Sequence, residues 1–321
     1  MDEQKRVLPL SPATSRFVRA VWKAQTNIPW DFLHSFVYAR WPYLYIGIGS
    51  GRHPIARMLT SISQAWNKLF PEVEPEGSPR HSTTQASGTS ADIYHGKVLP
   101  LHSAQELVMV NEPIDLPDLE QVIPYVRARA IIQQNPDHIL LMQCPCRLSQ
   151  SDPCLPLDVC MVIGEPFVEF IHQHYPTRAR RITQQEAIDI LEREDARGRV
   201  HHAFFSEMML GRFFAICNCC SCCCVAMKNQ RQGTPMLASS GFVAQVDRTR
   251  CASCGTCEDY CNFGALGMIN NATAVDERLC MGCGVCESKC PQGAISLCLD
   301  ATKGIPLEIS SLIESLPEVP V

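Results

Sequence analysis

The chain has 321 residues, of which 46% are hydrophobic and 19% charged, so it is long enough for two folded domains and is not a disordered tail. All 19 cysteines follow residue 143. The first 20 residues carry charges and prolines but no apolar stretch typical of an export signal, which argues against a secreted disulfide framework. We therefore expect a cytoplasmic protein whose clustered cysteines serve metal binding or redox chemistry.

The net charge of −5 conceals an asymmetry between the two ends of the chain. Residues 1–70 hold nine Lys or Arg against three Asp or Glu, whereas residues 251–321 hold three against nine. This difference favours two surfaces that meet different partners, with a plain solvated face as the alternative. The basic residues are scattered, so nucleic acid is not an expected partner. No apolar run reaches the roughly 18 residues that an integral membrane protein needs to cross a bilayer.

The N-terminal region, residues 1–70, is predicted to be helical and aromatic. A helix is expected over residues 11–27, and residues 30–45 contain seven of the 23 aromatic residues. These aromatic side chains form either the core of an N-terminal subdomain or a basic, aromatic patch on a partner subunit or at a membrane surface, where the protein would be peripheral. Residues 71–92 are rich in Pro, Glu, Ser, Thr and Gly and are expected to be a flexible linker.

The central region, residues 93–238, is predicted to be a cysteine-rich α/β domain within an overall α+β fold. Helices are expected over residues 124–134 and 183–198, the second opened by the capping pair Thr183 and Glu186. Short strands are expected over residues 139–142, 200–205 and 213–216. The first and last of these strands lead directly into cysteine clusters, so loops at strand ends would present the thiols from a rigid base.

Eight cysteines near the C-terminus form two copies of the spacing C-x2-C-x2-C-x3-C. The first copy is Cys251, Cys254, Cys257 and Cys261, and the second is Cys280, Cys283, Cys286 and Cys290, followed by Pro291. The repeat extends to Val246-Asp247 with Val275-Asp276, and to Gly264-Ala265 with Gly293-Ala294. Three thiolates spaced by two residues can surround one corner of a cubane cluster, and small residues between them let amides approach the sulfurs.

These motifs resemble a bacterial two-cluster [4Fe-4S] ferredoxin module, which would occupy residues 239–300 and leave residues 301–321 as a tail. The resemblance implies a ferredoxin-like fold with two [4Fe-4S] clusters and crossed ligation. One cluster would be held by Cys251, Cys254, Cys257 and Cys290, and the other by Cys280, Cys283, Cys286 and Cys261. Asn262 stands where the second repeat has proline, which leaves the turn and the solvent exposure near Cys261 open. Cys298 aligns with an apolar residue and is expected in the core.

Ten further cysteines lie upstream in two groups along the chain. They are Cys144, Cys146, Cys154 and Cys160, then Cys217, Cys219, Cys220, Cys222, Cys223 and Cys224. Six cysteines in eight residues cannot all face one core, because adjacent side chains point in different directions. Cys217, Cys220 and Cys223 repeat the cubane step, and Cys219 with Cys222 offers a second pair. The interpretations are one or two further iron–sulfur clusters, one cluster of unusual nuclearity, a structural zinc site, or a dithiol redox pair.

Arg147, His201 and His202 are three polar residues of the central region that could contribute to a site. Arg147, directly after Cys146, is a candidate cofactor-binding residue that donates hydrogen bonds to cluster sulfides, with an ordinary surface arginine as the alternative. His201 and His202 lie on an expected strand with side chains on opposite faces. At most one of them can therefore reach a metal.

The C-P-C-R stretch at Cys144, the C-N-C-C-S-C-C-C stretch at Cys217 and the C-terminal module together resemble larger ferredoxin-type proteins of anaerobic bacteria. The resemblance implies an electron carrier or electron-transfer subunit rather than a stand-alone enzyme. We expect it to pass single electrons between redox protein partners through two [4Fe-4S] clusters and at least one upstream cluster, with the acidic end docking on a basic partner. The alternative is a reductase subunit whose catalytic cluster at the upstream cysteines is fed by the ferredoxin module.

Overall fold

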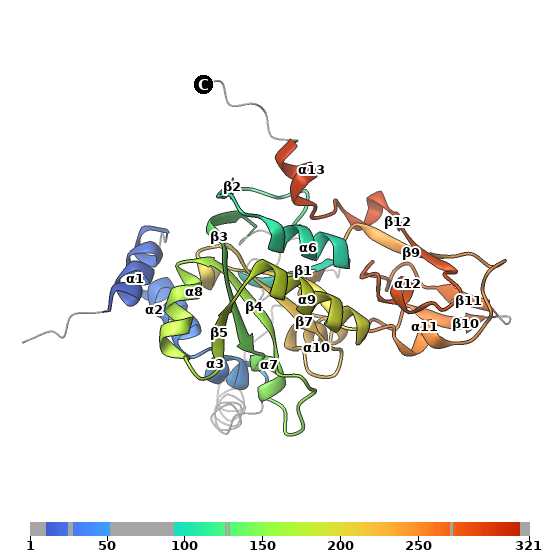
Figure 1. Ribbon diagram of the computed structural model, residues 1–321, viewed down its shortest axis with the longest axis horizontal. Helices are drawn as coiled ribbons and strands as arrows, with labels where there is room; N and C mark the ends of the chain where they lie inside the picture. The colour runs from blue at the N-terminus through green and yellow to red at the C-terminus, as the bar shows by residue number, and fades with distance from the viewer. Residues whose placement is uncertain are drawn as a thin grey trace, which may run out of the picture.

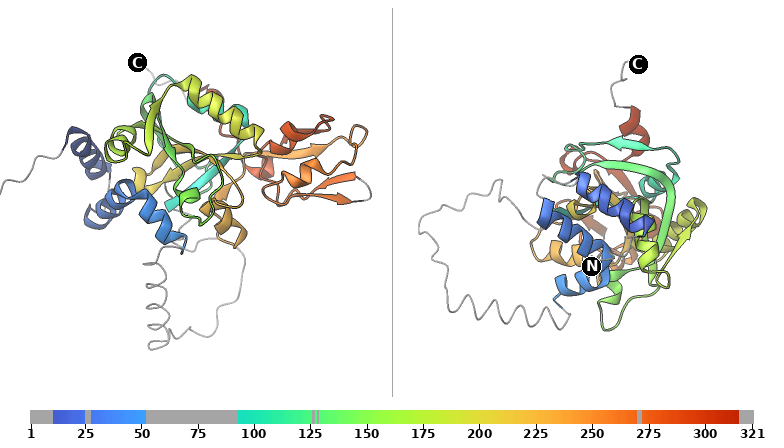
Figure 2. Two further views of the ribbon diagram at one scale, coloured as in Figure 1. Left: turned by 60° about the horizontal axis from the view of Figure 1, so that its bottom comes forward. Right: turned by 90° about the vertical axis from the view of Figure 1, so that its left-hand side faces the viewer.

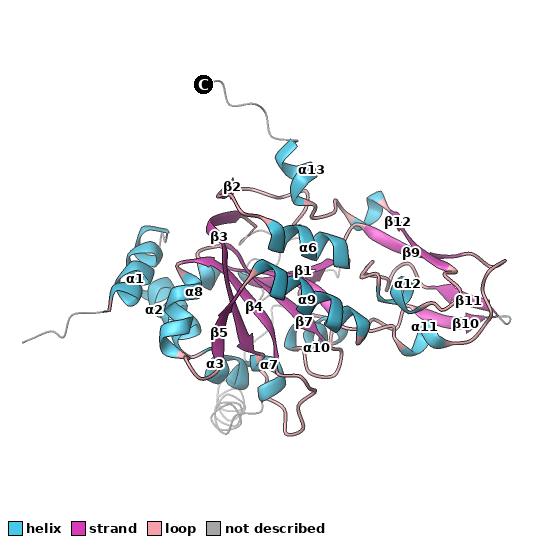
Figure 3. Cartoon of the chain, in the orientation of Figure 1, coloured by secondary structure: helices cyan, strands magenta, loops and turns pink. Residues whose placement is uncertain are grey.

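A computed structural model describes residues 11–24, 28–51, 93–125, 127, 129–269 and 272–314 of the chain. It has a larger part built on one sheet and a smaller C-terminal part that projects from one end of it (Figure 1). Helices and strands are mixed along the chain, in agreement with the α+β class (Figure 3). The expected linker over residues 71–92 lies outside the described residues.

Eight strands form the sheet of the larger part, in the order β2-β3-β4-β7-β6-β1-β8, with β5 paired to β3. Their bounds are β1 Tyr94–Leu99, β2 Ile114–Leu116, β3 Ile131–Gln143, β4 Asp158–Glu165, β5 Ala179–Ile182, β6 Val200–Ser206, β7 Arg212–Cys219 and β8 Leu237–Ala238. Every neighbouring pair is antiparallel except β1 with β8. The central part is therefore not the α/β domain expected from the sequence, because α/β domains are built on parallel strands.

Strand β3 shows a second difference from the sequence prediction. The helix expected over residues 124–134 is wrong: turns lead into β3, where Ile131 pairs with Leu116 of β2. Farther along, β3 pairs with β4 on one side and β5 on the other. These partners lie far away in the sequence, so local periodicity does not reveal them. The strands predicted over residues 139–142, 200–205 and 213–216 are confirmed as parts of β3, β6 and β7.

Helices cover both faces of the sheet (Figure 2). One face carries α6 (Leu101–Met109) and α9 (Gln184–Ala196). Residues that line a cavity on the opposite face come from α2 Ile28–Arg40, α3 Pro42–Gly49, α7 Pro145–Leu148, α8 Phe167–His174, η1 Glu207–Met209 and α10 Val225–Arg231. Helix α9 begins at the predicted cap, where the hydroxyl of Thr183 accepts a hydrogen bond of 3.2 Å from the amide of Glu186. None of the helices described is long and apolar enough to span a bilayer.

Most of the N-terminal aromatic side chains that the structure describes pack in or against the core of the sheet, whereas Trp22 and Trp41 are exposed. Helix α1 (Pro12–Ala24) packs on α8, and the ring of Tyr38 lies edge to face with Phe214 of β7, 6.2 Å between centroids. The Tyr43 hydroxyl donates a hydrogen bond of 3.1 Å to the carbonyl of Gln143. These contacts bury much of the aromatic surface against the sheet. The N-terminal helices thereby close the cavity face of the sheet.

The smaller C-terminal part contains two antiparallel strand pairs. Strand β9 (Phe242–Val246) pairs with β12 (Ile295–Leu299), and β10 (Leu266–Ile269) pairs with β11 (Ala272–Val275). Its other elements are α11 Thr256–Asp259, α12 Val285–Lys289 and η2 Ala301–Lys303, whereas α13 (Ile309–Glu314) packs on α6 of the larger part (Figure 1). The smaller part has its own hydrophobic cluster, which includes Val243, Leu266 and Ile295.

Lys97 of β1 is a buried cation that ties the sheet to the C-terminal segment. Its side chain is 1% exposed, and Nζ donates hydrogen bonds to the carbonyl oxygens of Val122 at 3.0 Å and Ile305 at 2.8 Å. Burial lowers the pKa of Lys97 to about 8, from an ordinary value of 10.5. Between these two pKa values the unfolded chain binds more protons than the folded chain, so stability rises with pH in this window.

Raising the pH from 7 to 9.5 is expected to stabilise the wild-type protein by about 2 kcal/mol relative to a Lys97→Met variant. The reason is that the folded wild type loses its buried charge as the amine deprotonates, whereas the unfolded chain stays protonated. Thermal unfolding of both proteins at one heating rate measures the change. A difference between the two proteins that stays constant across this range would contradict a buried lysine charge.

Candidate functional site

The two C-terminal cysteine motifs have equivalent surroundings. The amide of Ala265 donates a hydrogen bond to Cys261 Sγ at 3.1 Å, and the amide of Ala294 donates one to Cys290 Sγ at 3.2 Å. Hydrogen bonds to sulfur favour the thiolate and stabilise it as a ligand. These matching contacts give a physical reason for the Gly-Ala pair that follows each motif in the sequence.

The two repeats exchange backbone hydrogen bonds. The amide of Asp247, in the first repeat, donates to the carbonyl of Ala294 in the second at 2.8 Å. The amide of Asp276, in the second repeat, donates to the carbonyl of Ala265 in the first at 2.7 Å. The end of each motif therefore lies beside the beginning of the other.

Two cavities in the C-terminal part are each lined by four cysteines. The first cavity, of about 10 Å³, is lined by Cys251, Cys254, Cys257 and Cys290. The second cavity, of about 20 Å³, is lined by Cys261, Cys280, Cys283 and Cys286. Each quartet takes three cysteines from one motif and the last cysteine of the other. This is the grouping that crossed ligation requires.

The two cavities differ in their access to solvent. Cys254 is exposed at the first cavity, and hydrogen bonds from the hydroxyl and amide of Thr256 lower the pKa of its thiol. Cys283 faces the second cavity, where loss of solvent raises the pKa of its thiol to about 12. A bound cluster supplies the positive charge that keeps such a thiol ionised. The first cavity is thus the more accessible of the two.

Cys298 stands apart from both quartets. It lies on β12 opposite Val243, is half-buried, and lines neither cavity. The expectation that it fills a core position is met only in part, because its side chain keeps some exposure. Its separation from both cavities makes it a suitable control position for cysteine substitutions.

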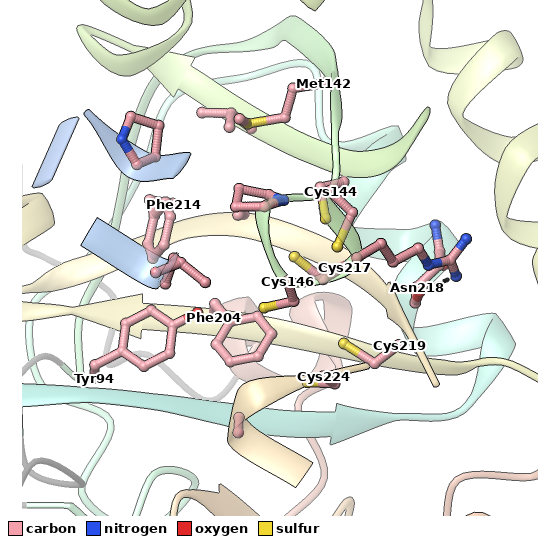
Figure 4. Close-up of a pocket in the computed structure, with 18 of the residues that line it drawn as sticks. Tyr94, Met142, Cys144, Cys146, Phe204, Phe214, Cys217, Asn218, Cys219 and Cys224 are labelled. Carbon is pink, nitrogen blue, oxygen red and sulfur yellow. Dashed lines mark hydrogen bonds between the residues drawn. The ribbon is translucent and has the colours of Figure 1, made fainter. Parts of the chain in front are cut away.

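A third and larger cavity, of about 70 Å³, lies against the sheet in the central part; we call it the deep cavity (Figure 4). Cys220 and Cys223 lie at its lining, together with six cysteines that we call the inner set: Cys144, Cys146, Cys160, Cys217, Cys219 and Cys224. The register places Cys160 of β4 opposite Cys217 of β7, so both thiols point to the same face of the sheet. Tyr94, Phe204 and Phe214 lie on the other side of the cavity.

The six thiols of the inner set interact in a continuous series. Their order is Cys217, Cys160, Cys144, Cys146, Cys224 and Cys219. Contact with Cys146, together with burial, raises the pKa of Cys144 to about 12, and contact with Cys144 raises the pKa of Cys160 well above its usual value. Burial also contributes to the raised pKa values of Cys144, Cys160 and Cys219, so thiolates at these positions need a cation among them. Soft thiolate donors of this kind fit an iron–sulfur cluster.

The other four upstream cysteines form a compact set, which we call the outer group. They are Cys154, Cys220, Cys222 and Cys223, and their Sγ atoms lie within 4.8 Å of one another. The grouping expected from spacing is met only in part. Cys217 lines the deep cavity together with Cys220 and Cys223 but lies outside their compact set, and Cys219 lines that cavity whereas Cys222 does not. The reason is that β7 continues to Cys219 before the chain turns, and spacing alone does not show where the strand ends.

Arg147 lies beside the cysteines and is not a surface arginine. Its side chain is 1% exposed and lines the deep cavity. The guanidinium donates hydrogen bonds to the carboxylate of Glu194 at 3.3 Å, to the carbonyl of Asn218 at 3.0 Å, and to the carbonyl of Pro156. Burial opposes the charge, but nearby thiols and Glu194 raise the pKa of Arg147. Its hydrogen bonding to cluster sulfides stays a prediction.

Sequence reasoning missed the residues that hold Arg147. Glu194 lies on the buried side of α9, and no spacing in the sequence connects it with the cysteines. Asn218 stands inside the C-N-C-C stretch, which is the only local signal of its role. Its side chain donates to the carbonyl of Val159 at 2.9 Å, so it also joins β7 to β4.

His201 and His202 lie on opposite faces of β6, as their positions on one strand predict. His201 Nδ1 is 2.7 Å from Asn218 Oδ1, on the face covered by α9. His202 is opposite Cys217 on the cavity face but does not line the cavity. Burial lowers the pKa of His202 to about 3, so its ring is neutral. Neither histidine reaches the lining of the deep cavity.

Asn262 joins the C-terminal part to the upstream cysteines. Its Oδ1 accepts a hydrogen bond of 3.3 Å from the amide of Ser221, within the segment 217–224. Its Nδ2 donates a hydrogen bond of 2.9 Å to the carbonyl of Gly198. The second repeat has proline at this position, which offers neither contact. Because Asn262 follows Cys261 directly, the second cavity lies next to this junction.

Residues 273–296 match the family described as 4Fe-4S binding domain. The match spans the second cysteine motif. None of the curated proteins matches the chain. Three of the matched cysteines line the second cavity, and the fourth, Cys290, lines the first.

Proposed function

Since the chain is an iron–sulfur protein that carries a 4Fe-4S binding domain, we propose that it conducts single electrons between two redox partners. The observation that carries this proposal is the junction at Asn262. It joins a cysteine-lined cavity of the C-terminal part to the segment that holds six of the upstream cysteines.

In this proposal the first and second cavities each hold one [4Fe-4S] cluster, and the deep cavity holds a further iron–sulfur cluster. Each crossed quartet supplies four thiolate ligands to one [4Fe-4S] cluster. The inner set supplies the thiolate ligands of the cluster in the deep cavity. Clusters held by thiolates gain and lose one electron with little change in shape. The protein's own contribution is to hold the sulfurs, to donate amide hydrogen bonds to them, and to exclude water with apolar walls.

The cysteine groups follow one another through the molecule. The first and second cavities share the small C-terminal core, which includes Cys257 and Cys286. From the second cavity, Cys261 leads through Asn262 to Ser221, which the chain places between two cysteines of the outer group. Cys220 and Cys223 of that group also line the deep cavity. This succession of contacts supports a path for electrons from the C-terminal tip to the sheet.

The first cavity is the proposed point of entry for electrons. Cys254 is exposed there, and the neighbouring Glu258 and Asp259 are exposed as well. Negative charge around an accessible cluster attracts a basic redox protein and speeds a transient encounter. The deep cavity, closed by the N-terminal helices, would pass the electrons to a second partner.

The proposal predicts that upstream iron is reduced through the C-terminal part. In a Cys280→Ala, Cys283→Ala double variant, the upstream iron should remain bound, but its reduction by reduced methyl viologen should become several-fold slower than in wild type. Rapid mixing under anaerobic conditions, followed by EPR of the frozen samples, measures these rates. Cys298→Ala is the control and should keep the wild-type rate.

Two outcomes would refute this path for electrons, which we call the electron conduit. One is an unchanged rate of upstream reduction in the double variant, which would mean that electrons reach the sheet directly. The other is wild-type protein with about eight iron atoms in total, the content of two [4Fe-4S] clusters, and none upstream.

The deep cavity also favours a second candidate, a reductase subunit with a catalytic cluster. Its apolar side, with Tyr94, Phe204 and Phe214, offers a wall that is not made of cysteine. Small apolar-walled sites with a few reactive groups are typical of substrate pockets. A conduit and a reductase differ in one measurement: only in a reductase should small molecules change the EPR signal of the upstream iron.

A further inference from the structure

The outer group differs from every other cysteine set in its compactness. Its four Sγ atoms all lie within 4.8 Å of one another, with Cys222 at 3.7 Å from Cys223 and at 2.8 Å from Cys154. In the part of the chain that the structure describes, no other set of three or more Cys, His, Asp or Glu side chains is gathered this closely. The four sulfurs of the first cavity and the four of the second are therefore spread more widely than those of the outer group, although each set also consists of four cysteine thiols.

This difference in spacing matches a difference in what four thiolates can hold. Around one tetrahedral Zn²⁺ or iron ion, with metal–sulfur bonds of about 2.3 Å, the sulfurs stand about 3.8 Å apart. Around a cubane, each thiolate binds a different corner from outside, so the four sulfurs must surround the whole cluster. The first and second cavities each keep a void among their four cysteines, whereas the sulfurs of the outer group all lie within 4.8 Å of one another, as ligands of a single ion do.

The backbone around the outer group is fixed from several sides. The amide of Cys224 donates to the carbonyl of Cys220 at 3.1 Å, which closes the turn that carries three of the thiols. Inside that turn, Arg231 donates to the carbonyl of Ser221, and Asn262 accepts from its amide. The loop that carries the fourth thiol is held by the hydrogen bond from Arg147 to Pro156. The thiols thus come from two anchored segments that a shared ion would crosslink.

We propose that Cys154, Cys220, Cys222 and Cys223 bind a single tetrahedral metal ion, Zn²⁺ or iron, that is separate from any iron–sulfur cluster. Four protein thiolates complete its coordination, as in closed structural sites. The ion crosslinks the loop after α7 to the turn after β7, next to the junction with the C-terminal part. The proposed electron path passes the outer group, but this inference does not depend on it, because a single ion there needs no cluster at the inner set or at the two C-terminal quartets.

A Cys154→Ala, Cys222→Ala double variant tests the proposal. Both cysteines belong to the outer group and neither lines the deep cavity. The variant should lose about one metal ion per chain, with acid-labile sulfide unchanged, because a single ion contains no sulfide. Elemental analysis of anaerobically purified protein measures the loss and shows whether the ion is zinc or iron; either one supports the proposal. Cys298→Ala, outside all sets, should lose none.

Two results of this experiment would overturn the proposal. A loss of about four iron atoms with about four sulfide ions would mean a cubane at the outer group. No loss of metal would mean that the outer group holds no ion, and a disulfide between Cys154 and Cys222, found by mass spectrometry of the wild-type protein, would then identify a dithiol redox pair.

A second measurement does not require the variant to fold. Wild-type protein produced with cobalt in the medium should show the absorption bands of tetrahedral Co²⁺ bound to thiolates, which differ from those of six-coordinate Co²⁺ in oxygen ligands. The absence of these bands in cobalt-loaded protein would also contradict a single-ion tetrahedral site.

Discussion

Replacing Cys261 with alanine is expected to remove the same iron as replacing Cys286, and different iron from that removed by replacing Cys257. The crossed quartets place Cys261 and Cys286 at the second cavity and Cys257 at the first, although Cys257 and Cys261 belong to one motif. Alanine supplies no ligand, so each variant should lose about four iron atoms and about four sulfide ions. Iron and acid-labile sulfide counts, with EPR of the reduced protein, identify the missing cluster.

The control for this series is Cys298→Ala, which should keep the full iron content, because Cys298 lines neither cavity. If the Cys257 and Cys261 variants lose the same EPR signal, each motif holds its own cluster and crossed ligation is refuted. This comparison is sharp because the two cysteines are close neighbours in the sequence and yet line different cavities.

An Arg147→Met variant is expected to lower the free energy of unfolding by about 3 kcal/mol. The substitution removes a buried cation from the carboxylate of Glu194 and leaves the carbonyls of Asn218 and Pro156 without their donor. Glu194 keeps one partner, Arg197, at 2.6 Å, which limits the loss. Unfolding measured under anaerobic conditions, at equal metal content, gives the difference.

Arg197→Met is the matched control, because both arginines bind the same carboxylate. The Arg197 side chain is 47% exposed, and removing an exposed partner should cost no more than about 1 kcal/mol. The Arg147 variant has a second expected effect, a lower reduction potential of the upstream iron, because a positive charge near the thiolates is lost. If the two substitutions lower the free energy of unfolding equally, the burial of Arg147 does not strengthen its contribution to stability.

The repeat in the C-terminal part could be recognised in the sequence because its signals are local. The alanine of the Gly-Ala pair after each motif donates its amide to the last cysteine, and Gly255 and Gly284 both adopt positive φ at the start of a short helix. Such contacts span few residues, so residue type and spacing determine them. The capping pair at Thr183 belongs to the same class.

The division of the upstream cysteines could not be predicted in this way. Cys154 joins three cysteines of the turn after β7, with its Sγ 2.8 Å from that of Cys222, although the two residues are far apart in the sequence. Cys160, which follows soon after Cys154, instead lies opposite Cys217 at the deep cavity. The register between β4 and β7 decides this division, and strand register depends on the packing of the whole sheet.

What the sequence by itself determined is the local chemistry of the protein: two copies of the C-x2-C-x2-C-x3-C spacing, ten further upstream cysteines, and a short-range repeat that positions amides near sulfur. What only the tertiary structure decided is which thiols meet, that Arg147 is buried against Glu194, and that Asn262 links the C-terminal part to Ser221. The physical reason is the separation along the chain between the residues that make each contact. Spacing along the chain constrains contacts within a few residues, whereas contacts between distant segments depend on strand pairing and burial, which arise only when the whole chain packs.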